Sequence, residues 1–412
     1  MTKRTAIFGT TPLFSDHIPV TRPLLPELEE IRPALEGILK TGILSKGHHC
    51  VELEESIAIE LEVKHVVAVS SCTTGLMLTY QALELSGDVV VPSFTFMSTV
   101  SALRWVGLRP VFADVDPHTT NVTPDTVRAA LTPQTSAIVA VHNFGNPCDI
   151  DGLHKLAEEH GLRLIFDAAH AFGSRYRDQP VGKQGHVQVF SMSPSKLVVA
   201  GEGGIVATDS EELAAKIRIA REFGNCGDYD TEVHGVNGRL PEINALLAHH
   251  SFANLERAVE NRQHVAALYR ERLGRLPGIA FQEIKAEDRS SHKDFPIMID
   301  SETFGLTRDE LALTLKAENI DTRSYYDPPA HRQRAYRVFA PPGGLPHTEA
   351  LSQNILCLPI WSAMSLDVVE KVCDAIGAAQ RFAGSIHSLL NTTNSVEWIL
   401  PTEPIETSVV EA

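Results

Sequence analysis

Short apolar runs alternate with amphipathic segments between residues 65 and 210. The runs are rich in Val, Ile and Phe, which is typical of buried strands, and the segments between the first five runs have helical periodicity. Strands that alternate with helices form mostly parallel sheets covered on both faces. The pattern therefore predicts a seven-stranded α/β sheet from these runs: HVVAVSS (65–71), DVVVPS (88–93), RPVFADVD (109–116), SAIVAVHNFG (136–145), LRLIFDAA (162–169), HVQVFSMS (186–193) and GGIVATD (203–209).

Two features of this pattern indicate how the sheet is built and where its ligand lies. The last two runs follow each other without a helix, so one of these strands is expected to be antiparallel. Ligands of open α/β sheets bind at the carboxyl ends of the strands. The ligand is therefore expected at the residues that end the runs: 71–74, 93–96, 142–145, 167–170 and 191–196.

The pattern becomes helical after residue 210. SEELAAKIRIAREFG begins with a Ser cap followed by acidic residues, and a single long helix is expected from roughly residue 240 to 275. Beyond LPGIAF, the strand FPIMID and the helix TRDELALTLKAEN predict a smaller α+β domain. We expect residues 1–275 to form the N-terminal segment and large domain, 276–384 the small domain, and 385–412 a loose polar tail.

Composition narrows the class of protein. With 43% hydrophobic and 21% charged residues the chain is typical of globular proteins, and its net charge of −16 argues against nucleic acid or an anionic membrane surface as partner. The six cysteines show no CxxC spacing, so no metal site is predicted and reduced thiols are expected. The sequence has neither a signal-peptide core nor an apolar run of about 20 residues. We therefore expect a cytoplasmic protein.

The stretch FSMSPSKLVVAGEGG (190–204) places Lys196 between serines and glycines. Three interpretations compete: a solvated surface lysine, a phosphate-binding lysine, or a lysine that carries a cofactor as a Schiff base. The glycines match neither GxGxxG nor GxxxxGK[ST], which weakens the phosphate-loop interpretation. A lone lysine is most often surface-exposed, so the choice depends on its neighbours.

Three neighbouring features favour the Schiff base. SSCTTGLML begins a helix directly after a strand and can bind an anion, although a plain capped helix has the same sequence. Asp167 ends an apolar strand, where a carboxylate can face the pyridinium nitrogen of pyridoxal phosphate (PLP), or simply cap a helix. Phe96 follows a strand and can stack on a cofactor ring or belong to the core. All three lie at the carboxyl ends of one predicted sheet, which favours PLP.

With these residues assembled, residues 18 to 380 resemble the DegT/StrS family of sugar aminotransferases, which share the fold-type I architecture of aspartate aminotransferase. The resemblance rests on six ordered blocks: TGILSKG, SSCTTGL, PSFTF, FDAAHAFG, FSMSPSKLVVAGEGG and HGVNGRLPEINA. Three positions depart from the family pattern, since Cys72 replaces a glycine, Phe166 often a glutamate, and Gly238 a bulkier residue. The lysine itself is kept, whereas histidine there is typical of the family's dehydratases.

The resemblance implies a role for each matched residue. Lys196 would carry the cofactor as a Schiff base and move the substrate proton, and Asp167 would pair with the pyridine nitrogen. The other implied cofactor contacts are His170 near the 3-hydroxyl, Cys72, Thr73 and Ser191 at the phosphate, Phe96 on the ring, and Asn237, with Arg239 supporting its loop. Because the family's Asn237 position reaches the neighbouring subunit's cofactor, a homodimer with shared active sites is also implied.

The resemblance further implies transfer of an amino group from an amino acid, L-glutamate, to a nucleotide-linked keto-sugar by a ping-pong mechanism. The sequence VSS…SGDVVVPSFTF…ALRW…DAAHAFG resembles the subgroup that aminates carbon 4 of a dTDP-4-keto-6-deoxy sugar. The alternatives are amination at carbon 3 or of a keto-cyclitol, and a non-catalytic protein that binds PLP or an amino-sugar.

Substrate contacts are expected from two further stretches. One is the N-terminal block with His48 or His49, and the other is RSYYDPPAHR, with Tyr325, Tyr326 and His331. These side chains can meet a sugar or its diphosphate. The competing interpretation of RSYYDPPAHR is a packed loop between the two domains.

Overall fold

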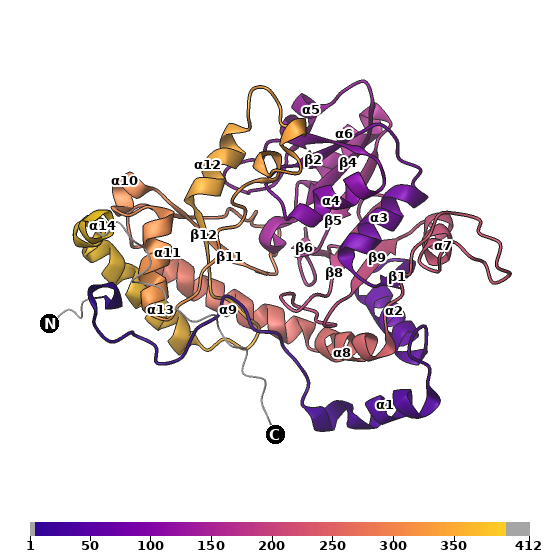
Figure 1. Cartoon of the computed structure of the whole chain (residues 1–412), viewed down its shortest axis with the longest axis horizontal. Helices are drawn as coiled ribbons and strands as arrows, with labels where there is room; N and C mark the ends of the chain where they lie inside the picture. Colours follow the sequence, from indigo (N-terminus) through magenta and orange to yellow (C-terminus); the bar gives the residue numbers. More distant parts are fainter. Residues whose placement is uncertain (1–4, 393–412) are drawn as a thin grey trace.

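The computed structural model describes residues 5–392, and its centre is a seven-stranded sheet (Figure 1). The strand order is β1-β9-β8-β5-β4-β2-β3, and β9 is antiparallel to both of its neighbours whereas all other pairs are parallel. The predicted fold class and the antiparallel strand are thereby confirmed. The strands are β1 (His65–Val69), β2 (Asp88–Pro92), β3 (Arg109–Ala113), β4 (Thr135–Val141), β5 (Arg163–Asp167), β8 (Val187–Ser191) and β9 (Gly204–Thr208).

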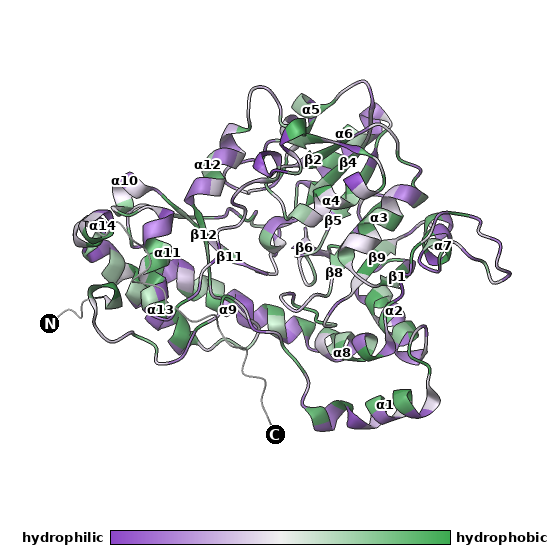
Figure 2. Cartoon of the chain, in the orientation of Figure 1, coloured by the Kyte–Doolittle hydropathy of each residue, from purple (hydrophilic) through white to green (hydrophobic). Residues whose placement is uncertain are grey.

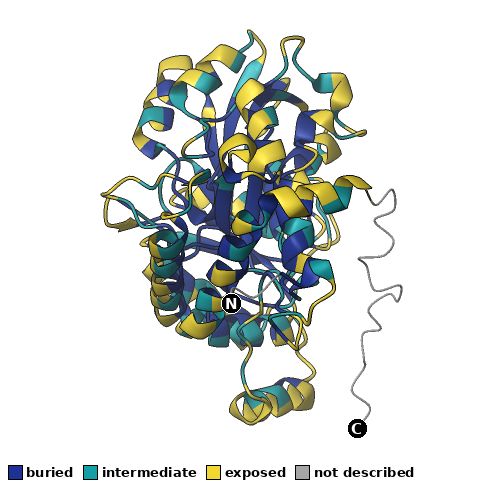
Figure 3. Ribbon diagram, turned by 90° about the vertical axis from the view of Figure 1, so that its left-hand side faces the viewer, coloured by how far each residue is buried: buried dark blue, intermediate teal, exposed yellow. Residues whose placement is uncertain are grey.

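Helices cover both faces of this sheet, which explains why its strands are continuous apolar runs. In β4, Ala137 and Val139 pack with helices α3, α4 and α7, whereas Ile138 and Ala140 face the side of α2 and α6. Strand residues are accordingly apolar and buried through the middle of the molecule (Figures 2 and 3). The covering helices are α2 (His48–Glu60), α3 (Cys72–Ala82), α4 (Met97–Trp105), α5 (Pro124–Ala130), α6 (Ile150–His160) and α7 (Glu211–Ala220).

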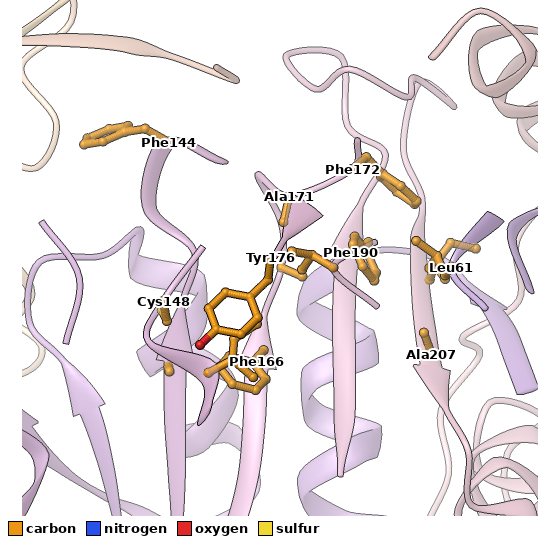
Figure 4. Packing of buried hydrophobic residues seen from close by; sticks show 14 of the residues in the cluster. Leu61, Phe144, Cys148, Phe166, Ala171, Phe172, Tyr176, Phe190 and Ala207 are labelled. Carbon is orange, nitrogen blue, oxygen red and sulfur yellow. The ribbon is translucent and has the colours of Figure 1, made fainter. Parts of the chain in front are cut away.

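Aromatic side chains fill the core on the α2 and α6 face close to the carboxyl ends of the strands (Figure 4). The rings of Phe172 and Phe190 lie 4.4 Å apart between centroids, and Phe166 lies nearby on β5. Phe166 is fully buried and stacks on His142 at 4.8 Å. The family often has a glutamate at the position of Phe166. In this chain the Phe166 side chain belongs to the core and does not form part of the Asp167 site.

A second apolar cluster surrounds a three-stranded antiparallel sheet in the C-terminal part of the chain. Ile7, Phe14 and Ile18 also belong to this cluster. The N-terminal stretch, which we grouped with the large domain, thus packs on the C-terminal part. The elements are β10 (Ile279–Phe281), β11 (Phe295–Ile299), β12 (Ile355–Leu358), α9 (Leu255–Leu273), α10 (Ser301–Phe304), α11 (Arg308–Ala317), α12 (Pro346–Asn354), α13 (Leu366–Arg381) and α14 (Ala383–Thr392).

Two predictions about the helices were wrong. The long helix expected from 240 to 275 is two helices, α8 (Glu242–Ala253) and α9, because the backbone of Asn254 leaves helical geometry at φ −100° and ψ 8°. The tail expected to be loose from residue 385 is helical up to Thr392, since Ile386 of α14 is fully buried in the second cluster. The rest of the expected tail, 393–412, lies outside the described residues.

Helix α1 (Leu28–Thr41) projects from the edge of the molecule and contacts it through α8 (Figures 1 and 3). Ile38 is its one buried residue, and Leu28 and Leu39 are 53% and 64% exposed. This helix therefore presents apolar side chains to solvent in the isolated chain. Within residues 5–392, no helix is long and apolar enough to cross a membrane.

Candidate active site

A cavity of about 290 Å³ opens at the carboxyl ends of the central strands. Residues from β5, from the loop after β8 and from the start of α3 meet there, and the loop 325–326 forms another part of its wall. Nine of the predicted site residues line this one cavity: Cys72, Thr73, Phe96, Asp167, His170, Ser191, Lys196, Tyr325 and Tyr326.

The first turn of α3 offers a site for an anion. Ser71 caps the helix by accepting a hydrogen bond from the N–H of Thr74 at 3.1 Å. The N–H groups of Cys72 and Thr73 have no acceptor among residues 5–392, and they lie at the positive end of the helix dipole. Gly204 of β9 lies directly beneath, because a Cβ there would be 2.5 Å from the Cys72 nitrogen. The glycine thus permits the helix start and the sheet to approach closely.

Asp167 ends β5 as a buried carboxylate held by neutral donors. The Thr99 hydroxyl donates to Oδ2 at 2.7 Å, and the Ala169 N–H donates to Oδ1 at 3.1 Å. Burial raises the pKa of Asp167, and these hydrogen bonds oppose that effect. No ion pair to Asp167 forms within the described part of the chain. A buried carboxylate of this kind is suited to a cationic partner that the ligand brings.

Lys196 lies on a tight turn after β8, where its N–H donates to the Ser193 carbonyl at 3.0 Å. Burial, and then the positive charge of Lys293, lower the pKa of Lys196 to about 8. A substantial fraction of its amine is therefore neutral near physiological pH, as a nucleophile or a proton acceptor requires. The interpretation of Lys196 as a solvated surface lysine does not fit this position.

His170 lines the cavity as a neutral imidazole. Its Nδ1 accepts a hydrogen bond from the Phe144 N–H at 3.1 Å, so the proton is on Nε2. Burial, and then the charges of Lys196 and Lys293, hold the pKa of His170 well below its usual value. His170 is thus prepared to donate one hydrogen bond from Nε2.

Phe96 precedes α4 and is 49% exposed at the cavity, whereas Phe94 is fully buried in the core. The alternative interpretation of Phe96 as a core residue is thereby ruled out. Tyr326 is buried with its ring edge-on to Phe94 at 5.2 Å, and Tyr325 is more accessible. Both tyrosines line the cavity. This part of the loop is therefore packed against the core and also forms part of the cavity wall.

His331 does not line the cavity. It is 1% exposed, with Nδ1 2.6 Å from the Ser93 hydroxyl and Nε2 3.0 Å from the Glu349 carboxylate. Because both ring nitrogens are engaged inside the protein, the interpretation of His331 as a substrate contact does not fit the structure. The packed-loop interpretation holds at this residue.

Three other predicted residues, His48, His49 and Asn237, lie outside the cavity of their own chain. His48 and His49 are at the start of α2, where both approach Glu52, and His48 is largely exposed. Asn237 is exposed, and its Oδ1 accepts from Arg239 Nε at 3.0 Å, so Arg239 holds this loop as expected. The exposed side chains of His48 and Asn237 are thus available to another molecule, whereas that of His49 is largely buried.

Sequence reasoning missed two residues of the site. Thr99 supports Asp167 from the first turns of α4, and Lys293 lies in the cavity wall just before β11. Neither has a motif of its own, although Thr99 follows PSFTF within one helical turn. In the described chain no group of three His, Cys, Asp or Glu side chains is arranged to hold a metal ion.

The donor set of the cavity fits PLP. The free N–H groups of Cys72 and Thr73 suit its phosphate, and the buried Asp167 carboxylate suits a pyridinium nitrogen. A lysine amine with a lowered pKa suits its aldehyde.

Comparison with known proteins defines the class. The model of the DegT/DnrJ/EryC1/StrS aminotransferase family matches residues 27–377. A dTDP-4-amino-4,6-dideoxy-D-glucose transaminase from Escherichia coli is 33% identical over 359 residues, 86% of this chain and 96% of that protein. DesI, crystallised in the presence of its TDP-sugar product, superposes with a TM-score of 0.89 at 38% identity, over 96% of this chain and 100% of the other.

A second solved relative is DesV from S. venezuelae, in complex with a ketimine intermediate, with a TM-score of 0.81 and 31% identity. The match covers 90% of this chain and 99% of that one. The fold and the enzyme class are therefore those of an aminotransferase, as predicted. The chain belongs to the DegT/DnrJ/EryC1/StrS aminotransferase family.

Proposed function

We propose that this enzyme transfers an amino group from L-glutamate to carbon 4 of a dTDP-4-keto-6-deoxy sugar. The observation that carries the proposal is the meeting of Lys196, Asp167 and the free helix start of α3 in one cavity. The sugar assignment is supported by the similarity to the Escherichia coli transaminase and to DesI with its TDP-sugar product. The product class would be an amino-sugar nucleotide.

The family resemblance implies which residues would hold PLP, and the lining of the cavity supports these roles. Cys72, Thr73 and Ser191 would bind the phosphate, Phe96 would cover the ring, and His170 would donate to the 3-oxygen through Nε2. Asp167 would hold the ring nitrogen in its protonated form. Bound there, PLP supplies an electron sink for the carbon from which a proton is removed.

Lys196 would have two tasks. Its amine would bind the cofactor's aldehyde carbon in the resting enzyme, and would be released when the donor's amine replaces it. Neutral Lys196 would then accept the proton from the donor's α-carbon and deliver it to the cofactor's former aldehyde carbon, as its pKa of about 8 permits. The same residue would run these proton transfers in the opposite order with the keto-sugar, which makes ping-pong kinetics the expected pattern.

We also propose a homodimer whose two active sites are shared. Asn237 is exposed and lies outside its own chain's cavity, and α1 presents Leu28 and Leu39 to solvent. A second copy of the chain would cover such surfaces and bring Asn237 to its neighbour's phosphate site. His48 and Tyr325 would contact the nucleotide-sugar. A cytoplasmic location, the absence of nucleic-acid and membrane partners, and the domain boundary near residue 276 stay predictions.

The test begins with the visible absorbance of the purified protein before and after L-glutamate. We expect a yellow protein that bleaches, and borohydride reduction followed by peptide mapping should attach the cofactor to Lys196. The matched control for Lys196→Ala is Lys316→Ala, at an exposed position of α11. A colourless protein, or a trap on another lysine, would overturn the assignment and leave a binding protein as the alternative.

The bleached enzyme is then mixed with keto-sugars. Recovery of the yellow form with dTDP-4-keto-6-deoxyglucose, and not with a 3-keto-sugar nucleotide or a keto-cyclitol, would support amination at carbon 4. A preference for either of the other two substrates would contradict it.

A further inference from the structure

The cavity contains a second lysine that the mechanism above does not use. Lys293 lines the wall next to Tyr325 and is 3% exposed. Its Nζ lies 2.9 and 3.1 Å from the two carboxylate oxygens of Asp294, itself 1% exposed. A buried ammonium costs free energy unless it is paired, and such a pair is weak evidence for stability alone. Its place in a reaction cavity calls for a functional explanation.

The backbone around Lys293 is fixed from two sides. Fully buried Arg262 of α9 donates from its Nη1 to the carbonyl oxygens of His292 and Lys293 at 2.9 and 3.0 Å. The Lys293 N–H in turn donates to the carbonyl of Phe144, in the turn after β4 of the large sheet, at 3.0 Å. Lys293 is therefore held on a rigid support, as residues that orient a ligand generally are.

The segment that carries Lys293 is also hydrogen-bonded to a cavity residue of the large domain. The Ser291 hydroxyl donates to the His170 carbonyl at 2.7 Å, and His170 is a cavity residue. Lys293 lines the same cavity as Lys196, and after burial its positive charge is the main cause that lowers the pKa of Lys196.

The ammonium retains capacity for a ligand. It has three N–H donors, and the two oxygens of Asp294 account for two of them. Nζ also lies 5.8 Å from the centre of the Tyr325 ring, which covers it on one side without using a hydrogen bond. One donor is left for an anion that enters the cavity.

The identity of that anion follows from where the reaction takes place. An anion beside both Lys293 and Lys196 must belong to a group close to the reacting carbon. In an amino acid the α-carboxylate is bonded directly to that carbon, whereas in a nucleotide-sugar the sugar ring separates the diphosphate from carbon 4. We propose that Lys293 binds the α-carboxylate of the amino-acid donor, an inference that rests on the proposed aminotransferase function.

The test separates the two half-reactions in the purified holoenzyme. The variants are Lys293→Met, Lys293→Arg and the double variant Lys293→Met with Asp294→Asn, which leaves no buried carboxylate unpaired. Lys316→Met on α11 is the surface control. Melting temperature and cofactor absorbance establish that each variant is folded and loaded. The probes are L-glutamate, its α-amide, and dTDP-4-keto-6-deoxyglucose added to the aminated enzyme.

We expect the wild type to prefer L-glutamate over its α-amide by roughly 10- to 100-fold, the value of one charge-assisted hydrogen bond. The methionine variants should lose most of this preference, and Lys293→Arg should restore part of it. Loss of the Lys293 charge also raises the pKa of Lys196 and so changes the rates of both half-reactions. The ratio of the rates with L-glutamate and with its α-amide is therefore the quantity that reports on binding of the carboxylate.

Three outcomes would overturn the proposal. Lys293 would instead bind the diphosphate if the keto-sugar reaction alone were lost. It would act only through Lys196 if both half-reactions fell together and the preference between glutamate and its α-amide persisted. It would have no role if the methionine variants matched the wild type. Failure of the wild type itself to react with any amine would count against the proposed function, and so is distinguishable from failure of the Lys293 assignment.

Discussion

The Thr99 hydroxyl donates a 2.7 Å hydrogen bond to the buried carboxylate of Asp167, and so joins α4 to the end of β5. Burial raises the pKa of this carboxyl, and the Thr99 hydrogen bond is the largest of the effects that lower it. The ionised form of Asp167 therefore depends on a residue that belongs to no recognised block.

Replacement of Thr99 by valine is expected to raise the pKa of Asp167 further and to weaken its hold on a cationic ring nitrogen. A hydrogen bond to a charged group is worth about 1.5–3 kcal/mol, so the glutamate half-reaction should slow by roughly 10- to 100-fold. Stopped-flow absorbance measures this rate. Thr99→Ser, which keeps the hydroxyl, should remain near the wild type, and a fully active valine variant would contradict the assigned role.

The lowered pKa of Lys196 predicts how the apoenzyme takes up its cofactor. The neutral amine is the reactive form, so the rate of PLP attachment should rise with pH and level off above about pH 8. An ordinary lysine would give a rate that still rises above about pH 10. Absorbance after mixing apoenzyme with PLP across a pH series distinguishes the two curves.

The same shift predicts the sign of a stability change in the apoenzyme. Between about pH 8 and the ordinary lysine value of 10.5, the unfolded chain binds a proton at Lys196 that the folded chain has lost. The contribution of Lys196 to the free energy of unfolding should therefore increase with pH in that window. Lys196→Met should remove this increase, as denaturant titrations of the two apoproteins at both ends of the window would show.

His331 was predicted to contact the substrate, but the structure places it in the protein interior. Its Nε2 faces the carboxylate of Glu349, an acceptor only, so Nε2 carries the proton and Nδ1 accepts from the Ser93 hydroxyl. Burial lowers the pKa of His331, in agreement with a neutral ring. The histidine thus joins the segment after Tyr326 to the end of β2.

His331→Ala is therefore expected to act on stability. Loss of one buried and one partly buried hydrogen bond should lower the free energy of unfolding by about 2–4 kcal/mol and leave the KM for the sugar nearly unchanged. Thermal and denaturant unfolding measure the first effect, and steady-state kinetics the second. His154→Ala, on the exposed side of α6, is the matched control. An increased KM with unchanged stability would restore the substrate interpretation.

The sheet was predictable because its strands are buried on both faces and therefore read as continuous apolar runs. The cavity residues that follow those runs, such as Asp167 and Lys196, were predictable because strand ends meet at one edge. Thr99 and Lys293 were missed for a physical reason. Each acts through contacts that the folded chain creates, with carboxylates and backbone from other elements, and a single threonine or lysine carries no periodicity or spacing that reveals such contacts.

Long-range packing also explains the misjudged segments. Asn254 separates α8 from α9 within a stretch of helical periodicity, and Ile386 orders the start of a segment whose composition indicates a loose tail. The attachment of Ile7 and Phe14 to the C-terminal cluster depends on partners about 300 positions away in the chain. None of these contacts is encoded in local pattern.

Glu242 connects α8 to the N-terminal block. Its carboxylate accepts from the N–H groups of Gly47, His49 and Cys50 at 2.8, 3.0 and 3.1 Å, and so caps α2 from a distant element. Burial raises the pKa of Glu242, but the Cys50 thiol and these three N–H groups outweigh it and leave the pKa lowered. The stabilisation is thus present above the ordinary glutamate value and is lost as the pH falls through the folded-state pKa.

Glu242→Ala is expected to lower the free energy of unfolding by about 2–4 kcal/mol at neutral pH, because three backbone donors lose a charged acceptor. Glu242→Gln should lose part of that amount and should be less sensitive to acid than the wild type. Denaturant unfolding at neutral and acidic pH tests both. An alanine variant of unchanged stability would show that water replaces the carboxylate without cost.

The exposed position of Asn237 allows the proposed shared active sites to be tested by mixing two defective chains. Asn237→Asp would place a negative charge against a phosphate in the partner's site, and Lys196→Ala removes the reactive amine from its own. In a mixed dimer with shared sites, one site contains both defects and the other contains neither. Random association at equal amounts should therefore restore about a quarter of the wild-type activity.

Two differently tagged chains, co-expressed and purified through both tags, would isolate the mixed dimer. If Asn237 served the cavity of its own chain, every site in that dimer would carry one defect and no activity would return. Lys196→Ala paired with the wild type is the control, since one intact site is expected whichever chain supplies the asparagine. Because Asn237 Oδ1 is already engaged by Arg239, its amide nitrogen is the group free to reach across, and Arg239→Ala should weaken the restored activity by loosening that side chain.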